Sequence, residues 1–178
     1  MKKEKCRVQL TAGAAVFYPL LFILDGDGWL AALLPGVVFH ELGHLLALHL
    51  SGGQVYLLRL EAAGLYLDAK PFTSQRQALI CTAAGPAAGL LWATVPMMKV
   101  SPWGVKSAAA AIVINGFNLL PALPLDGGEI LLILTGSRTA AVVCSWAVVG
   151  ALTVAFAVYR AWGLLVPALL IARTVVSS

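Results

Sequence analysis

Six long apolar runs dominate this chain of 178 residues and limit what it can fold into. A transmembrane helix needs about 20 apolar residues to cross a hydrocarbon core of roughly 30 Å. Hydrophobic residues make up 60% of the chain and charged residues 11%, against about 25% charged residues in globular proteins, so a soluble core of this size could not bury the excess. The sequence therefore predicts an all-α polytopic membrane protein with about six transmembrane helices. The runs cover approximately residues 8–24, 29–50, 76–98, 104–123, 140–159 and 162–176.

Two segments depart from the pattern of regular transmembrane helices. The fourth run ends at Pro121 and Pro124 and is followed by Asp126-Gly127-Gly128, so we expect a broken fourth helix that continues over residues 129–135. Residues 54–68 alternate with a period of two between flanking glycines, and they are too few to cross the membrane. This segment predicts a short membrane-associated β-hairpin at the cytoplasmic face, with an irregular interfacial loop as the alternative.

The basic residues predict how the helices are oriented in a cell membrane. With the N-terminus in the cytoplasm, Lys99, Lys106 and Arg160 face outward and the other nine basic residues face inward. An excess of Lys and Arg in cytoplasmic segments is the usual pattern of membrane proteins, so we expect both termini to be cytoplasmic. Basic residues in these positions do not form a groove that could bind phosphates, so we expect no nucleic-acid partner. The nine inward residues are Lys2, Lys3, Lys5, Arg7, Arg59, Lys70, Arg76, Arg138 and Arg173.

The second apolar run contains three ionisable residues in the segment His40-Glu41-Leu42-Gly43-His44. One charged residue at the centre of a bilayer already costs about 2.5–3.5 kcal/mol, so this cluster needs a functional reason. His40 and His44 are four residues apart and share one face of a helix, so both imidazoles can reach one metal ion. Glu41 projects about 100° round the helix, near the open side of the metal. In this H-E-x-x-H arrangement, zinc lowers the pKa of a bound water and Glu41 takes its proton.

A catalytic zinc site usually has three protein ligands and a water molecule, so a third ligand is needed. Asp126 is the first choice because it follows a segment interrupted by prolines, and non-helical backbone at membrane depth is tolerated where it lines a wet cavity. The second and fourth spans both run inward in the predicted topology, which brings His44 and Asp126 to the same cytoplasmic half. Glu129 is the competing ligand, although the N-terminus of a helix would also favour a carboxylate there.

These segments resemble the motifs of the site-2 protease family of intramembrane zinc metalloproteases. The first motif is His40-Glu41-Leu42-Gly43-His44, and the second is Asn118-Leu-Leu-Pro-Ala-Leu-Pro-Leu-Asp126-Gly-Gly. Gly85-Pro86 is similar to a third and weaker motif of that family. The resemblance covers roughly residues 29–135. The compact chain is most similar to the bacterial sporulation branch, which releases a sigma factor from its pro-form.

The resemblance implies a single intramembrane metalloprotease domain over residues 1–178 that binds one zinc ion and cleaves a membrane-embedded segment. It also implies that Asn118 positions the substrate or the transition state. Residues 54–68 resemble the strand region that borders the active site in the family, and we expect the substrate to add a strand there. The expected site residues are His40, His44 and Asp126 for zinc, Glu41 for catalysis, and Asn118, Gly85, Pro86 and Leu58 for substrate binding.

The chain departs from the family pattern in ways that affect the expected site. An asparagine often follows the Gly-Pro motif in the family, where this chain has Ala88 and Gly89, so we expect one polar contact to the substrate or water to be absent. A basic residue commonly follows the Asp-Gly-Gly motif, where this chain has Glu129. We also expect no PDZ domain between the spans and no regulatory nucleotide-binding domain after Ser178, a domain that the sporulation branch often carries.

The leading functional hypothesis is an intramembrane zinc metalloendopeptidase, with another divalent ion as the alternative metal. A second hypothesis is a membrane metal-ion transporter that uses the same ligands as a relay site, although such transporters often have related halves and this chain shows none. A third is a catalytically inactive membrane-binding relative, against which the intact Glu41 and the three candidate ligands argue. The expected partners are a membrane-embedded protein substrate and the lipid bilayer, and the sequence leaves a homo-oligomer open.

Overall fold

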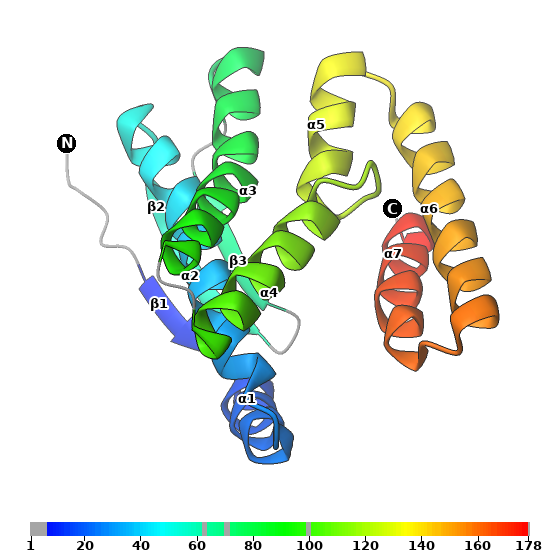
Figure 1. Cartoon of the computed structure of the whole chain (residues 1–178). Coiled ribbons are helices and arrows are strands. Elements are labelled where there is room, and N and C mark those ends of the chain that lie inside the picture. The colour runs from blue at the N-terminus through cyan, green and yellow to red at the C-terminus, as the bar shows by residue number, and fades with distance from the viewer. Residues whose placement is uncertain (1–6, 62–63, 70–71, 99–100, 178) are drawn as a thin grey trace.

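The computed structural model describes residues 7–61, 64–69, 72–98 and 101–177, which form mostly helices and one small sheet (Figure 1). In chain order the elements are β1 (Arg7–Leu10), α1 (Ala12–Leu24), α2 (Trp29–Leu50), β2 (Val55–Glu61), β3 (Gly64–Ala69), α3 (Gln75–Met97), α4 (Pro102–Asn118), α5 (Asp126–Thr135), α6 (Arg138–Tyr159), a 3-10 turn (Trp162–Leu164) and α7 (Leu165–Ser177). Helices α2, α3 and α4 lie together, and α6 and α7 lie beside each other on the far side of α5 (Figure 1).

Three helices in the described part of the chain are long and apolar enough to cross a membrane, namely α2, α3 and α6. This finding supports a membrane protein, whereas the count of six spans stays a prediction. The predicted first span is wrong at its start, because residues 7–10 form β1 and the Thr11 side chain caps α1. With 13 residues, α1 is about 20 Å long, which is less than the hydrocarbon thickness. The predicted orientation also stays a prediction, and several residues on which it depends lie outside the described ranges: Lys2, Lys3, Lys5, Lys70 and Lys99.

The other predicted helices agree closely with the structure. Helix α2 has the predicted bounds, and α3 and α6 begin within two residues of the predicted runs. The predicted break in the fourth helix is confirmed, because α4 ends at Asn118, residues 119–125 form an irregular loop, and α5 begins at Asp126.

Side chains at the helix starts explain where these helices begin. Ser74, Ser101 and Ser137 precede α3, α4 and α6, and each hydroxyl accepts a hydrogen bond from the backbone N–H three residues later. The Asp25 carboxylate accepts hydrogen bonds from the backbone N–H groups of the first two residues of α2. These caps fix the start of α2, and with it the position along the helix at which His40 and His44 occur.

Helices α2, α3 and α4 approach one another closely through small residues. A Cβ atom at Gly36 of α2 would overlap Ala111 of α4, and one at Gly43 would overlap the backbone of Ala84 in α3. Many large apolar side chains point outward, as lipid-facing residues do. Close approach of this kind is how membrane helices gain packing energy, because lipid provides no hydrophobic drive between them. The buried cluster at the centre consists of Ala93, Ala108 and Ala111.

The sheet confirms the predicted hairpin and corrects one residue of it. Strands β2 and β3 pair antiparallel, as predicted for residues 54–68, and β1 pairs with the other side of β2 in parallel. Leu58 of β2 is therefore registered with both Val8 and Leu67. The prediction that the substrate pairs at Leu58 is wrong, because a central strand already has a partner on each side. Among the described residues, β1 and β3 are the edge strands.

Candidate metal centre

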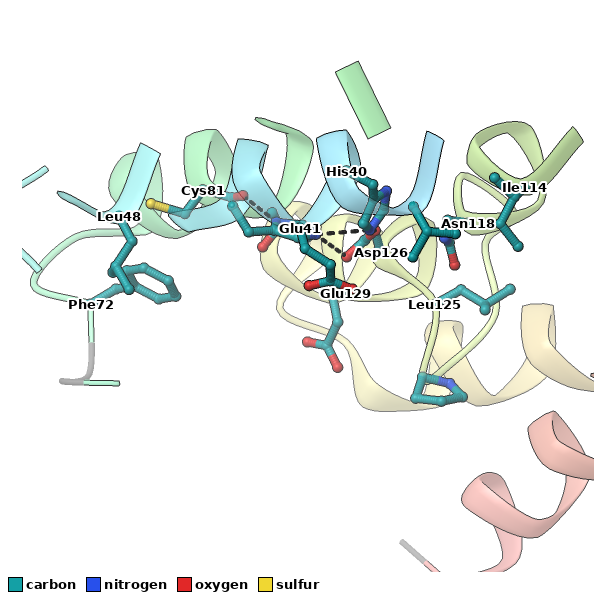
Figure 2. A pocket seen from close by; sticks show the side chains of 14 residues that line it. His40, Glu41, Leu48, Phe72, Cys81, Ile114, Asn118, Leu125, Asp126 and Glu129 are labelled. Atoms are coloured by element: carbon teal, nitrogen blue, oxygen red, sulfur yellow. Dashed lines mark hydrogen bonds and ion pairs between the residues drawn. The ribbon is translucent and has the colours of Figure 1, made fainter. Parts of the chain in front are cut away.

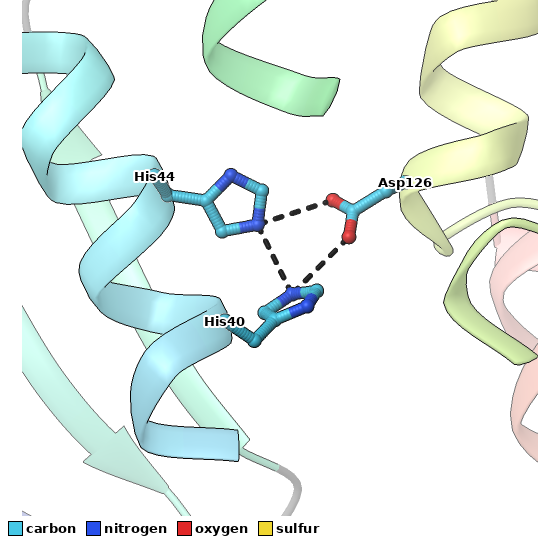
Figure 3. A group of neighbouring side chains, drawn as sticks. All are labelled: His40, His44 and Asp126. Atoms are coloured by element: carbon cyan, nitrogen blue, oxygen red, sulfur yellow. Dashed lines mark hydrogen bonds and ion pairs between the residues drawn. The ribbon is translucent and has the colours of Figure 1, made fainter. Parts of the chain in front are cut away.

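Helix α2 and the start of α5 bring three predicted ligands together (Figure 3). The Nε2 atoms of His40 and His44 are 3.1 Å apart, which follows from their spacing of one helical turn. Asp126 completes the group, with Oδ2 at 3.2 Å from Nε2 of His40 and Oδ1 at 3.5 Å from Nε2 of His44. One atom from each residue lies within 4.8 Å of the others, so the three side chains are close enough to hold one metal ion.

The second ring nitrogen of each histidine is also engaged. Nδ1 of His44 lies 2.8 Å from the backbone carbonyl of Cys81 in α3, and Nδ1 of His40 lies 2.8 Å from Oδ1 of Asn115 in α4. Both oxygens accept hydrogen bonds, so each Nδ1 carries the hydrogen and each Nε2 keeps its lone pair. Partners of this kind orient the histidine ligands of metal sites.

The resulting donor set fits a divalent metal. Two imidazole lone pairs and the Asp126 carboxylate all point at the same small space, where they repel one another. A single proton could bridge only one pair of these atoms, whereas a cation between them attracts all three. Two histidines and one carboxylate are also a ligand set found in catalytic zinc sites. Glu129, the alternative ligand, is not a member of this group.

The loop before α5 is held in place by α6. The backbone N–H of Leu123 donates a 2.9 Å hydrogen bond to Oγ of Ser145, a fully buried residue whose hydroxyl donates in turn to a carbonyl of its own helix. A buried backbone N–H without a partner would be costly, so Ser145 stabilises this non-helical segment. Cβ atoms at Gly127 and Gly128 would overlap the backbone of the same loop. The two glycines therefore allow α5 to start close to the loop, with Asp126 directed toward α2.

A cavity of about 580 Å³ opens beside the three ligands (Figure 2). The carboxylates of Glu41 and Glu129 are directed into it, and Asn118 lines it from the end of α4. Glu41 thus lies next to the ligand group without belonging to it. The Asn118 amide makes no hydrogen bond to any described residue, which leaves it available to a bound molecule. The remaining lining is mostly apolar: Val37, Leu48, Phe72, Cys81, Thr82, Ile114, Pro124 and Leu125.

Two predicted substrate-binding residues lie elsewhere. Gly85 and Pro86 are buried within the helix packing and are not among the residues that line the cavity. A Cβ atom at Gly85 would overlap the imidazole of His44. This glycine therefore makes room for a ligand side chain, which corrects the predicted role.

The sequence prediction also missed residues that hold the site together. Asn115 contacts His40, and it is a buried polar residue of α4 three positions before Asn118, on the same helical face. A polar side chain in an apolar helix costs free energy, and this cost is the signal that could have identified Asn115. The carbonyl of Cys81 leaves no such signal, because a backbone group is present at every position.

Comparisons with known proteins agree with this fold. No family model and no curated protein matches the sequence. The structure is similar to that of the site-2 protease from Methanocaldococcus jannaschii, with a TM-score of 0.72 and 20% sequence identity, over 99% of this chain and 92% of that one. The resemblance that the sequence motifs predict is thus confirmed at the level of the fold, and the chain has the fold of a site-2 protease.

Proposed function

We propose that this protein is an intramembrane zinc metalloendopeptidase that hydrolyses a peptide bond in or near a transmembrane segment of another membrane protein. The observation that carries this proposal is the convergence of His40, His44 and Asp126 beside a cavity into which Glu41 points. A cluster with a purely structural role would not need the Glu41 carboxylate, which is costly in an apolar helix, beside the three converging ligands. The site-2 protease fold supports the same reading.

Each residue of the site has a role in this reaction. A bound zinc ion would supply Lewis acidity toward the scissile carbonyl and the attacking water. The Glu41 carboxylate takes a proton from that water and returns it to the departing amine, as general base and then general acid. Asn118 donates hydrogen bonds from its free amide to the substrate backbone or to the oxygen that gains charge. The apolar lining excludes bulk water, which strengthens these electrostatic contacts.

The transporter alternative is less well supported by the same features. A transported ion needs a path through the protein and a site that releases it, and a relay site gives Glu41 no task. A protease needs both the metal ligands and a nearby base, and His40, His44, Asp126 and Glu41 supply them. In the proposed topology both termini are cytoplasmic, and the active site lies in the cytoplasmic half of a cell membrane.

The purified protein should cleave a model membrane substrate only while it holds metal. We expect close to one zinc ion per chain by elemental analysis, loss of cleavage after removal of zinc by a chelator, and recovery after zinc is added back. A chelator-treated sample that is returned to zinc-free buffer serves as the control. Full cleavage by a preparation that contains no metal would refute the proposal.

We further propose that an extended substrate adds to the edge of β3. Peptide bonds in a helix are shielded by their own hydrogen bonds, so the substrate must unwind, and an edge strand can pair the exposed backbone groups. Phe72 lines the cavity only three residues beyond the end of β3, a distance of at most about 11 Å along the chain. The end of this edge strand therefore lies close to a residue that lines the cavity.

Proline substitutions along β3 should test this route. At alternate positions among residues 65–68 the backbone N–H faces away from β2, and proline there removes a donor to the substrate only. We expect about two- to tenfold slower cleavage at those positions, since one hydrogen bond contributes roughly 0.5–1.5 kcal/mol. Zinc content should remain normal, and alanine at the same positions should be milder. Unchanged cleavage for every proline from 65 to 68 would show that the substrate enters by another face.

A further inference from the structure

We propose that Asn115 is a positioning residue that fixes the His40 imidazole for metal binding. Asn115 lies in α4, where no atom of it is exposed, and its Oδ1 is 2.8 Å from Nδ1 of His40 across the interface with α2. This inference rests on the proposed metal site, and it assigns a function to a residue of α4 that neither binds the metal nor lines the cavity.

The direction of the Asn115 amide is fixed by its second hydrogen bond. Nδ2 of Asn115 donates to the backbone carbonyl of Ala111 at 2.8 Å, and a carbonyl can only accept. The opposite orientation would set Oδ1 against that carbonyl, so Oδ1 must face His40. Nδ1 of His40 is therefore the protonated nitrogen, and the lone pair of Nε2 points toward Asp126.

Helix α3 holds the amide in this orientation from the other side. A Cβ atom at Gly89 would overlap the Asn115 carboxamide, so the two helices are in contact at this point. Ala111, whose carbonyl accepts the hydrogen bond from Nδ2, is itself fully buried. The asparagine that often follows the Gly-Pro motif in the site-2 protease family is absent from α3, and the Asn115 amide of α4 lies against Gly89 instead.

Loss of the hydrogen-bond acceptor at position 115 should weaken metal binding. Removing such a partner of a metal-bound histidine typically lowers metal affinity by about 10- to 100-fold. We expect that loss for Asn115→Leu, which has a similar size but no acceptor. Asn115→Asp keeps an acceptor oxygen toward Nδ1 of His40 but loses the Nδ2 donor to Ala111, so it should retain more of the zinc affinity than Asn115→Leu. The affinity is measured on purified protein by competition with a chromophoric zinc chelator.

Ser107→Ala provides the control for a merely structural role. Ser107 is also fully buried in α4, and its hydroxyl donates a 2.8 Å hydrogen bond to the carbonyl of Ala32 across the same interface with α2. It does not contact the ligand group. If Asn115 only held the helices together, Ser107→Ala would lower zinc affinity by a similar factor. We expect instead that Ser107→Ala changes the zinc affinity by no more than about twofold. This change is much smaller than the loss that is typical when the partner of a metal-bound histidine is removed.

The visible spectrum of the cobalt-substituted protein gives a second readout. Cobalt absorption depends on ligand geometry, so the Asn115→Leu spectrum should differ from the parent and that of Asn115→Asp should resemble it. Gly89→Ala displaces the amide without removing it, so this variant should also bind zinc more weakly than the parent. It takes the place of Asn115→Leu if that variant cannot be purified. Parental affinity in both Asn115→Leu and Gly89→Ala would overturn the inference, and so would equal losses in Asn115→Leu and Ser107→Ala. These measurements need no substrate, so a parent that binds zinc but cleaves nothing refutes the proposed protease and leaves this test valid.

Discussion

Replacing Glu41 with glutamine is expected to lower cleavage of a membrane substrate by about 10²- to 10⁴-fold, the usual contribution of general acid–base catalysis. Glutamine keeps the size of the side chain and can still form hydrogen bonds, but it cannot accept a proton from water. Because Glu41 lies outside the ligand group, zinc should remain bound in this variant. Cleavage rates at saturating substrate, measured together with zinc content, separate the chemical step from metal binding.

Glu41→Asp is the matched control for this experiment. Aspartate keeps a carboxylate but withdraws it by one methylene, so we expect an intermediate loss of activity with zinc retained. The glutamine variant should also hold uncut substrate, which can be recovered as a complex. Cleavage by Glu41→Gln at nearly the parental rate would exclude this glutamate as the base, and the water would then be activated by another group of the cavity.

The parts of the structure that the sequence predicts are those fixed by local spacing. Helix α2 is an apolar run with a carboxylate at its start, and the interval of four residues between His40 and His44 determines that they share a face. The break between α4 and α5 follows from Pro121 and Pro124, which cannot continue a regular helix. These features depend on neighbours within one or two helical turns, so the sequence contains enough information.

The parts that the sequence does not predict depend on contacts between distant segments. Residues 7–10 form a strand because β2 lies beside them, about 50 positions further along the chain, and the same pairing makes Leu58 central. Asn115 is 75 positions from His40, and the need for a glycine at position 85 appears only when His44 is packed against it. A single sequence does not specify which helices meet at which level, and so it gives these residues no distinct role.

Replacing His44 with alanine is expected to empty the metal site. Removing only the hydrogen-bond partner of a ligand lowers metal affinity by roughly 10- to 100-fold. Removing the ligand itself leaves two, and we expect a larger loss of zinc affinity than that. Alanine is the strongest helix former, so α2 should persist and the protein should still insert into membranes. Zinc content after dialysis and the circular dichroism spectrum measure the two effects separately, and cleavage should be absent.

Asp126→Ala tests the third ligand against its only rival on α5. Glu129 follows Asp126 by three residues, and its carboxylate is directed into the same cavity. In the structure Asp126 contacts both Nε2 atoms, whereas Glu129 is outside the ligand group. We therefore expect Asp126→Ala to lose zinc as His44→Ala does, and Glu129→Ala to retain it. The reverse pattern would make Glu129 the ligand and would move the metal about one turn further along α5.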